Sequence, residues 1–272
     1  MTAITKAFMQ SRASGYRALI PYFMAGYPSE GAFCRVVAES FAAGADIIEV
    51  GIPFSDPVAD GPAIQRAGQT ALEQGMTIDR ALGLLSSLRL QRHQPIVVMS
   101  YLNPLLQYGI NRFVASAFDA GVRGLIVPDM VVEESIHVKR ACKNAGIDLI
   151  HLLAPTSSAK RQEAILKKSS GFVYVVSVLG VTGARASLPE TLFDRVAAIK
   201  AQSRLPVAIG FGISSPAAAA RASEVADGVI VGSALVERLN PQISEDDQVH
   251  SVIDLIKQLR QATRIPPARV EK

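Results

Sequence analysis

Two carboxyl side chains, Glu49 and Asp60, are the first candidates for acid–base chemistry. Glu49 lies inside the apolar run DIIEVGIP (46–53). Apolar surroundings disfavour the charged form of a carboxyl group, which raises its pKa toward the working range of a general acid or base. A structural glutamate that caps the following loop or forms an ion pair at the rim is the alternative. Because acids with perturbed pKa values gather at functional sites, a charge within an apolar run favours the catalytic interpretation.

Asp60 lies in a segment bounded by proline and glycine, which also contains Ser55 and Asp56. An aspartate in such a loop often forms a turn or caps a helix, and Asp60 stands just before a helix expected to begin near Pro62. A second carboxylate near Glu49 would equally serve catalysis. The spacing alone leaves both roles open.

Three glycine-containing segments late in the chain indicate a phosphate site. They are GVTGAR (180–185), GFGIS (210–214) and GS (232–233), and each follows an apolar run. Glycine allows backbone N–H groups to approach an anion closely, and the start of a helix adds a favourable dipole. Glycine also serves ordinary turns, but three such segments at successive strand ends favour a phosphate ester as ligand. No nucleotide-binding glycine motif follows the first apolar run.

The remaining polar residues predict no metal site. The sequence has no H-x-H, no H-E-x-x-H and no acidic cluster. His151 lies within an apolar run, where a packed histidine is expected. Tyr174 lies in another run, and its phenol could either enter a pocket or pack in the core.

The elements that must position these residues form a regular alternation of apolar runs and segments of helical period. The runs are 18–26, 46–53, 95–101, 124–129, 148–155, 171–178, 206–212 and 228–232. They are rich in consecutive Val, Ile and Leu, as are strands buried on both faces of a parallel sheet. Several helical segments end in Ala-Gly, which is typical of a helix stop.

Eight such cycles in 272 residues predict an α/β fold, the (β/α)8 TIM barrel. An open doubly wound sheet is the alternative, and it would also place the site at the carboxyl ends of its strands. Residues 2–12 predict an extra N-terminal helix below the barrel, and residues 233–239 a short extra helix after the eighth strand. We expect one domain over 1–272, with 264–272 as a frayed tail.

Composition and charge exclude several classes of protein. Hydrophobic residues make up 49% and charged residues 19%, which is typical of a globular protein. The net charge of +4 is spread along the chain, so no nucleic-acid partner is expected. Cys34 and Cys142 lie in expected helices without a C-x-x-C motif, which indicates reduced thiols. No long apolar stretch predicts a membrane span or a leader, so we expect a cytoplasmic protein.

Several segments, taken together, resemble the tryptophan synthase alpha family. They are EVGIPFSDPVADGPAIQ (49–65), YLNPLLQYG (101–109), GLIVPD (124–129), VSVLGVTGAR (176–185), GFGIS (210–214) and GSALVE (232–237). The order is unbroken from about Ala18 to Glu237, and the first block is long and specific. The resemblance implies a carbon–carbon lyase that cleaves indole-3-glycerol phosphate to indole and D-glyceraldehyde 3-phosphate, with no cofactor in this chain.

The resemblance also implies roles for individual residues. Glu49 matches the general acid/base, and Asp60 matches the carboxylate that hydrogen-bonds the indole N–H. Positions that line the substrate pocket are matched by Tyr22, Tyr101, Tyr174 and Thr182. Positions that bind the phosphate are matched by Gly183, Phe211, Gly212, Gly232 and Ser233.

The same family works as an α2β2 complex, whose β subunit carries pyridoxal phosphate and uses the indole to make L-tryptophan. The resemblance implies that the loop containing Pro53 and Asp56, together with the segment after Asp129, faces this partner. The chain departs from the family pattern at Val131, where proline is usual. The affinity for the β subunit is therefore not predicted by the resemblance.

Three other functions are compatible with the same barrel. The chain could be a regulatory subunit that has lost catalysis, an isomerase or synthase for another sugar phosphate, or a lyase that releases indole without a β subunit. Intact Glu49 and Asp60 argue against the first. Indole as the product would exclude the second, and stimulation by a β subunit would exclude the third.

Overall fold

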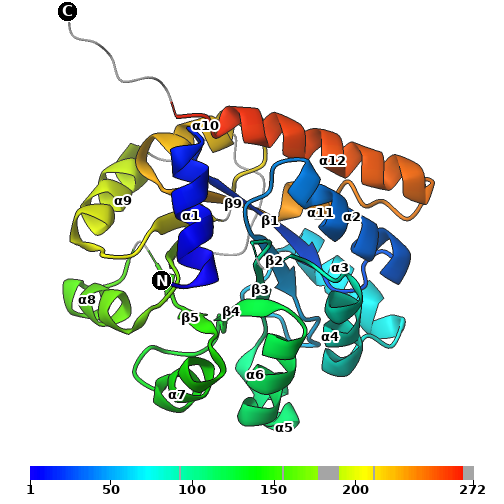
Figure 1. Ribbon diagram of the computed structural model, residues 1–272, viewed down its shortest axis with the longest axis horizontal. Helices are drawn as coiled ribbons and strands as arrows, with labels where there is room; N and C mark the ends of the chain where they lie inside the picture. The colour runs from blue at the N-terminus through cyan, green and yellow to red at the C-terminus, as the bar shows by residue number, and fades with distance from the viewer. Residues whose placement is uncertain (92, 155, 177–189, 211, 266–272) are drawn as a thin grey trace, which may run out of the picture.

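Parallel strands form the inner wall of a barrel, and helices form its outer layer (Figure 1). The computed structural model describes the chain apart from residues 92, 155, 177–189, 211 and 266–272. The strands are β1 (Ala18–Met24), β2 (Ile48–Gly51), β3 (Ile96–Met99), β4 (Val122–Ile126), β5 (Asp148–Ile150), β6 (Leu152–Leu153), β7 (Val173–Val176), β8 (Val207–Gly210) and β9 (Gly228–Val231).

Two connections complete the ring of strands, one at β1 and the other at the segment that contains β5 and β6. β1 pairs with both β2 and β9, which joins the beginning of the barrel to its end. On the other side, β5 pairs with β4 while β6 pairs with β7. His151 separates β5 from β6, and its carbonyl accepts a hydrogen bond of 3.3 Å from the Tyr174 N–H. The predicted strand 148–155 is thus two short strands, because its halves pair with different neighbours.

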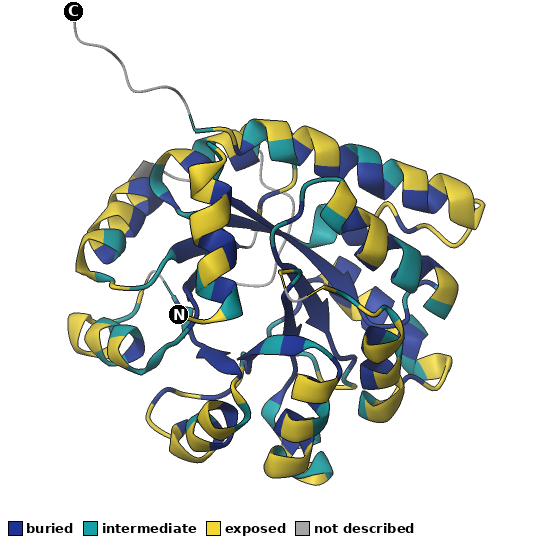
Figure 2. Ribbon diagram, viewed as in Figure 1, coloured by how far each residue is buried: buried dark blue, intermediate teal, exposed yellow. Residues whose placement is uncertain are grey.

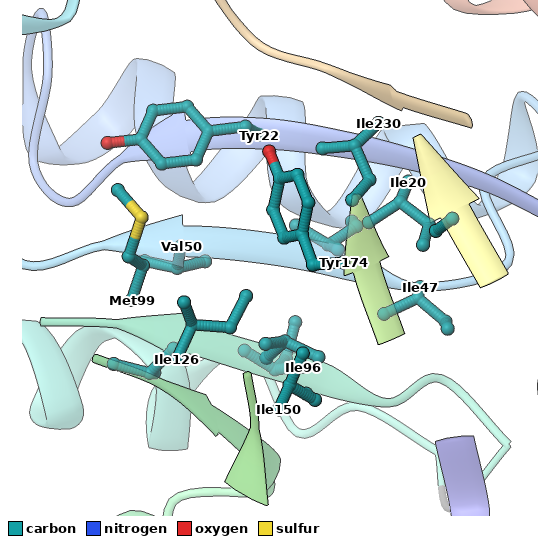
Figure 3. Packing of buried hydrophobic residues seen from close by; sticks show 14 of the residues in the cluster. Ile20, Tyr22, Ile47, Val50, Ile96, Met99, Ile126, Ile150, Tyr174 and Ile230 are labelled. Carbon is teal, nitrogen blue, oxygen red and sulfur yellow. The ribbon is translucent and has the colours of Figure 1, made fainter. Parts of the chain in front are cut away.

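This ring confirms the predicted (β/α)8 barrel and excludes the open sheet. Side chains fill its interior: Figure 3 shows Ile20, Ile96, Ile126, Ile150 and Ile230 gathered between the strands, and all five are buried. Full burial of such a side chain contributes about 1.5–3 kcal/mol. Because the middle of the barrel is packed, a ligand must bind at one of its ends.

Helices surround the barrel and turn their buried faces inward, as the colours in Figure 2 show. They are α1 (Ala3–Ala13), α2 (Glu30–Ala42), α3 (Pro62–Glu73), α4 (Ile78–Ser87), α5 (Leu102–Tyr108), α6 (Ile110–Asp119), α7 (Ile136–Ala145), α8 (Ala159–Lys168), α9 (Glu190–Gln202), α10 (Pro216–Val225), α11 (Ser233–Val236) and α12 (Glu245–Ala262). Several helices have a hydroxyl residue as N-cap, as at Ser29, Thr77 and Ser244. Its side chain accepts a hydrogen bond from a backbone N–H of the first turn. None of the described helices is long and apolar enough to cross a membrane.

Helix α1 covers the amino end of the barrel. Its residues Ile4 and Phe8 are buried, and the Phe8 ring lies 5.5 Å from the ring of Phe172. Two strand glycines make room for this helix: a Cβ on Gly124 would lie 2.6 Å from Ile4, and one on Gly228 would lie 2.8 Å from Phe8. With this end covered by α1, the carboxyl ends of the strands are left for a ligand.

The first two residues of the predicted frayed tail, Arg264 and Ile265, are attached to the fold. Arg264 forms a β-bridge with Tyr16, and the Ile265 N–H donates a hydrogen bond of 2.8 Å to the Gly15 carbonyl. These backbone bonds attach both residues to the segment between α1 and β1. The rest of the predicted tail lies outside the described residues.

The two cysteines lie in separate helices as free thiols, Cys34 in α2 and Cys142 in α7. Burial, with the charge of Asp148, raises the pKa of the Cys142 thiol to about 12. Since the thiolate is the reactive form, Cys142 is an inert core residue.

Candidate active site

A cavity of about 280 Å³ lies at the carboxyl ends of the strands. Its volume is close to the lower end of the range for small-molecule sites. The predicted site residues in its wall are Tyr22, Glu49, Asp60, Tyr174, Gly212, Gly232 and Ser233. Strands and loops remote in the sequence thus bring both candidate carboxyl groups and part of the candidate phosphate site to one place.

Glu49 projects from β2 into this cavity. It is 1% exposed, and its Oε2 atom has no hydrogen-bond partner among the residues described. Burial, assisted by the negative charge of Asp60, raises the pKa of Glu49 to about 8. The carboxyl group therefore holds a proton at neutral pH and can both donate and accept one. Such burial contradicts the alternative of a glutamate paired at the surface.

Asp60 lies immediately before α3 and is 6% exposed. The N-cap of α3 is Gly61, and no side chain caps this helix, so the alternative role of Asp60 as a cap is wrong. Burial raises the pKa of Asp60 to about 6, and a hydrogen bond from Tyr101 opposes the rise. Between about pH 6 and pH 8, Asp60 is ionised while Glu49 is protonated. Two carboxyl groups in one cavity can therefore play different roles.

Tyr101 holds the loop that carries Asp60. The Ala59 N–H donates a hydrogen bond of 2.9 Å to the Tyr101 hydroxyl, which in turn donates to the Asp60 carboxylate. The Tyr101 ring lies 5.3 Å from that of Phe54 at the start of the same loop. Burial raises the pKa of Tyr101, so its hydroxyl remains a donor. This tyrosine acts on the site by orienting Asp60, and it is not itself part of the cavity wall.

Two other tyrosines each pack over the glycine that ends the strand next to their own. A Cβ on Gly51 would lie 2.0 Å from the Tyr22 hydroxyl oxygen, and a Cβ on Gly210 would lie 2.2 Å from that of Tyr174. Tyr22 on β1 covers the last residue of β2, its neighbouring strand. In the same way, Tyr174 on β7 covers the last residue of β8. Figure 3 shows the Tyr174 ring near Ile20 and Ile230, and the Tyr22 ring on the side of Met99. Any side chain larger than hydrogen at either glycine would displace its tyrosine.

The predicted phosphate-binding residues fall into two groups. Gly212, Gly232 and Ser233 line the cavity. Gly183 and Phe211, together with the predicted pocket residue Thr182, lie outside the described residues. Helix α11 contains four residues, fewer than the predicted helix over 233–239. Because so short a helix has little macrodipole, an anion here would depend mainly on backbone N–H groups and the serine hydroxyl.

Some cavity residues were not identified from the sequence. They are the apolar Ile64, Met99, Ile213 and Ile230 and the charged Arg66 and Glu237. Met99 is the last residue of β3, and Ile230 is the last but one of β9, so counting inward-facing positions back from each strand end would have found them. Arg66 and Glu237 follow the site loops by a few residues but look like ordinary surface charges in the sequence.

The residues expected to face a partner differ in exposure. Pro53 is buried, whereas Asp56 is exposed and accepts a hydrogen bond of 2.6 Å from the Ser55 hydroxyl. Val58, on the same loop, is 77% exposed, and Val131 is 39% exposed. Two apolar side chains are thus open to solvent on the two segments that were expected to form an interface.

His151 behaves as a packed residue. Burial and the charges of Lys139 and Lys168 lower its pKa to about 4, so its ring is neutral at physiological pH. In the part of the chain that the structure describes, no group of His, Cys, Asp and Glu side chains could hold a metal ion.

The chain matches a known family over most of its length. The model of the tryptophan synthase alpha chain family matches residues 8–264. A tryptophan synthase alpha chain from Carboxydothermus hydrogenoformans is 46% identical over 256 residues, which cover 94% of this chain and 96% of that protein. One from Chloroflexus aurantiacus is 42% identical over 267 residues, with coverage of 98% and 100%.

Solved structures give the same result. Mycobacterium tuberculosis tryptophan synthase superposes with a TM-score of 0.89 at 37% identity, and the match covers 97% of this chain and 99% of that chain. Tryptophan synthase subunit alpha from Legionella pneumophila superposes with a TM-score of 0.88 at 36% identity, with coverage of 97% and 98%. Sequence and fold agree along almost the entire chain, which therefore belongs to the tryptophan synthase alpha chain family.

Proposed function

We propose that this chain cleaves indole-3-glycerol phosphate to indole and D-glyceraldehyde 3-phosphate, as a carbon–carbon lyase. The observation that carries the proposal is the pair of buried carboxyl groups, Glu49 and Asp60, which ionise at different pH values in one cavity. The cleavage needs an acid and a carboxylate anion at once. Near neutral pH, the site supplies both.

Glu49 is the proton carrier of the proposed reaction. Its protonated carboxyl group donates a proton to C3 of the indole ring, which leaves a positively charged C=N bond in the ring. The Glu49 carboxylate then accepts the proton of the adjacent glycerol hydroxyl. The electron pair of that O–H bond forms the aldehyde C=O, and the broken C–C bond returns its electrons to the ring. Glu49 thus gives one proton and recovers one.

Asp60 is the anion that stabilises the intermediate. Its carboxylate accepts a hydrogen bond from the ring N–H, and its charge offsets the positive charge that protonation of C3 creates. This role requires ionised Asp60, and the hydrogen bond from Tyr101 favours that state. Tyr101 also fixes the direction of the carboxylate through its bond with the Ala59 N–H.

The phosphate of the substrate would be held at the other group of cavity residues, Gly212, Gly232 and Ser233. Glycine exposes backbone N–H groups to the anion, and Ser233 adds a hydroxyl donor. Apolar side chains such as Met99 and Ile230 are suited to the indole ring. We propose that Thr182, Gly183 and Phe211 complete these subsites, as the family pattern implies.

We further propose that the indole passes to a β subunit within an α2β2 complex. The M. tuberculosis neighbour is a tryptophan synthase, and the exposed Val58 and Val131 offer apolar surface to such a partner. The chemistry assigned to Glu49 and Asp60 requires no cofactor in this chain. Pyridoxal phosphate would belong to the β subunit.

The test is indole release from indole-3-glycerol phosphate by the purified chain, with and without a β subunit. We expect slow release that rises with the β subunit. Glu49→Gln cannot donate a proton and should lower kcat by at least 100-fold, in line with the loss of general acid–base catalysis, about 10²–10⁴. Asp60→Asn should lower kcat strongly while leaving substrate binding measurable.

The controls separate the alternatives. Unfolding midpoints of both variants should stay near that of the wild type, which excludes loss of the fold as the cause. If the wild type binds the substrate but releases no indole under either condition, the lyase proposal fails and a regulatory role is favoured. Brisk release without a β subunit would instead identify a standalone lyase.

A further inference from the structure

The hydroxyl group of Tyr22 is a buried polar group to which the roles of Glu49 and Asp60 assign no function. Tyr22 is 4% exposed, and its hydroxyl oxygen has no hydrogen-bond partner in the described part of the chain. Leaving a buried hydroxyl unpaired destabilises a folded protein. Since Tyr22 also lines the cavity, a bound ligand can supply the missing partner.

The position of this hydroxyl follows from the register of the strands. Tyr22 on β1 is aligned with Glu49 on β2, so both side chains point into the same end of the barrel. The Tyr22 ring begins near Gly232, where a Cβ would lie 3.5 Å from its own Cβ. It ends over Gly51, where a Cβ would lie 2.0 Å from its hydroxyl oxygen. The ring therefore spans the carboxyl ends of β9, β1 and β2.

The hydroxyl lies over the catalytic face of β2. Glu49 and Gly51 are two residues apart on this strand, and alternate residues of a strand face the same side. A group over Gly51 is consequently a neighbour of the space that Glu49 faces. Tyr22, Glu49 and Asp60 all line the same cavity, and the negative charges of the two carboxyl groups help to raise the pKa of the Tyr22 hydroxyl.

We propose that Tyr22 contacts the substrate, its hydroxyl donating a hydrogen bond to the glycerol oxygen that loses its proton to Glu49. The inference rests on the proposed aldol cleavage. As the C–C bond breaks, this oxygen changes from a hydroxyl to a carbonyl and gains negative charge on the way. A fixed donor aimed at such an oxygen stabilises the transition state more than the ground state.

Tyr22 keeps its own proton in this scheme. Burial, with the charges of Asp60 and Glu49, raises its pKa well above the ordinary value, so the hydroxyl is a donor throughout the pH range of the reaction. The proton balance between Glu49 and the substrate is unchanged. Tyr22 contributes a hydrogen bond and no proton transfer.

The test is Tyr22→Phe, which removes one oxygen atom and keeps the ring that packs between Gly232 and Gly51. We expect kcat/KM for indole release to fall by about tenfold or more, because a donor specific to the transition state is lost. An analogue with a propyl chain in place of the glycerol, indole-3-propanol phosphate, has no hydroxyl to accept the bond. The Kd of Tyr22→Phe for this analogue should therefore stay within about twofold of the Kd of the wild type.

Two controls accompany this variant. Tyr16→Phe removes the same atom at the opposite end of the barrel, where Tyr16 stacks on Arg260, and should leave kcat/KM unchanged. The unfolding midpoint of Tyr22→Phe should equal or exceed that of the wild type, because the lost hydroxyl has no partner among the residues that the structure describes. A lower midpoint would reveal a structural partner and overturn the proposal.

Other outcomes also decide the matter. If Tyr22→Phe lowers kcat/KM for the substrate and the affinity for the analogue by the same factor, the hydroxyl contacts a part of the ligand other than the glycerol oxygen, and the proposal fails. A shift of the acidic limb of the pH profile would show that Tyr22 acts through Asp60. Unchanged kcat/KM in Tyr22→Phe refutes this inference alone, whereas absence of indole release by the wild type refutes the proposed function itself.

Discussion

The two carboxyl groups of the site have the same chemistry but are held in different states by their neighbours. Among the described residues no donor reaches the Oε2 atom of Glu49, whereas Asp60 accepts a hydrogen bond from Tyr101. Once Asp60 is ionised, its charge adds to the effect of burial on Glu49. The site is thus poised for a reaction that uses one acid and one anion near neutral pH.

These pKa values predict a bell-shaped pH dependence of indole release. Activity should rise through about pH 6, where Asp60 loses its proton, and fall through about pH 8, where Glu49 loses its proton. Tyr101→Phe removes a hydrogen bond that lowers the pKa of Asp60, so the acidic limb should move to higher pH while the alkaline limb stays in place. Rates of indole release measured from pH 5 to about pH 9.5 test both statements.

The substrate phosphate also titrates near pH 6. Comparison of Tyr101→Phe with the wild type on the same substrate removes this contribution, since the phosphate is common to both. Coincident acidic limbs in the two proteins would contradict the role given to Tyr101.

At the scale of elements, the cavity depends on how side chains of one strand cover the end of the next. Tyr22 over Gly51 and Tyr174 over Gly210 repeat one arrangement on opposite sides of β9. The strand order makes these pairs neighbours, and glycine makes the close approach sterically allowed. The glycines therefore shape the site although neither of them lines the cavity.

Gly51→Ala tests this arrangement. The added Cβ would lie 2.0 Å from the Tyr22 hydroxyl oxygen and 2.7 Å from its ring, so the tyrosine must move. Overpacking of this kind costs about 1–3 kcal/mol, and we expect a corresponding loss in the free energy of unfolding together with lower kcat/KM. Urea denaturation and indole release measure the two effects.

Gly83→Ala is the matched control. Gly83 lies in α4 with no atom within 4 Å of the added Cβ, and alanine favours a helix over glycine by about 1 kcal/mol. This variant should be as stable as the wild type or more so, with full activity. If both variants behave alike, the space over Gly51 is not restricted as described.

At the scale of the whole molecule, a polar cluster beneath the barrel ties the last helix to the beginning of the chain. Arg260 on α12 lies 2.7 Å from the Asp46 carboxylate and donates a hydrogen bond of 3.1 Å to the Ser11 hydroxyl. Asp46 also accepts a hydrogen bond of 2.8 Å from the Leu19 N–H. The cluster joins α1, β1, the start of β2 and α12, and so holds the two ends of the fold together.

Arg260→Met should destabilise this protein by about 3 kcal/mol, because it leaves the Asp46 carboxylate, whose side chain is only 13% exposed, without its cation. Urea denaturation monitored by circular dichroism measures the change. Arg35→Met is the control: Arg35 also joins α12 to another helix, through Glu245 and Asp246, but at an exposed position. Exposed ion pairs contribute little, so this variant should unfold at nearly the wild-type midpoint. Equal destabilisation by both variants would contradict the importance of the buried cluster.

Much of the barrel could be predicted from local pattern. The apolar runs marked the strands, and Ala-Gly stops marked helix ends, because both features belong to contiguous residues. The division of 148–155 at His151 could not be predicted, since it results from pairing with β4 on one side and β7 on the other. The attachment of Arg264 and Ile265 could not be predicted either, because their partners lie at the opposite end of the sequence.

By itself, the sequence determined the eightfold alternation, the family resemblance and the choice of Glu49 and Asp60 as the carboxyl groups of the site. Each of these is encoded in residue types and their spacing along the chain. Only the tertiary structure decided that Asp60 is not a helix cap, that Tyr101 reaches it, and that Tyr22 lies across Gly51 beside Glu49. Those relations depend on strand register and side-chain direction between segments remote in sequence, which residue spacing does not specify.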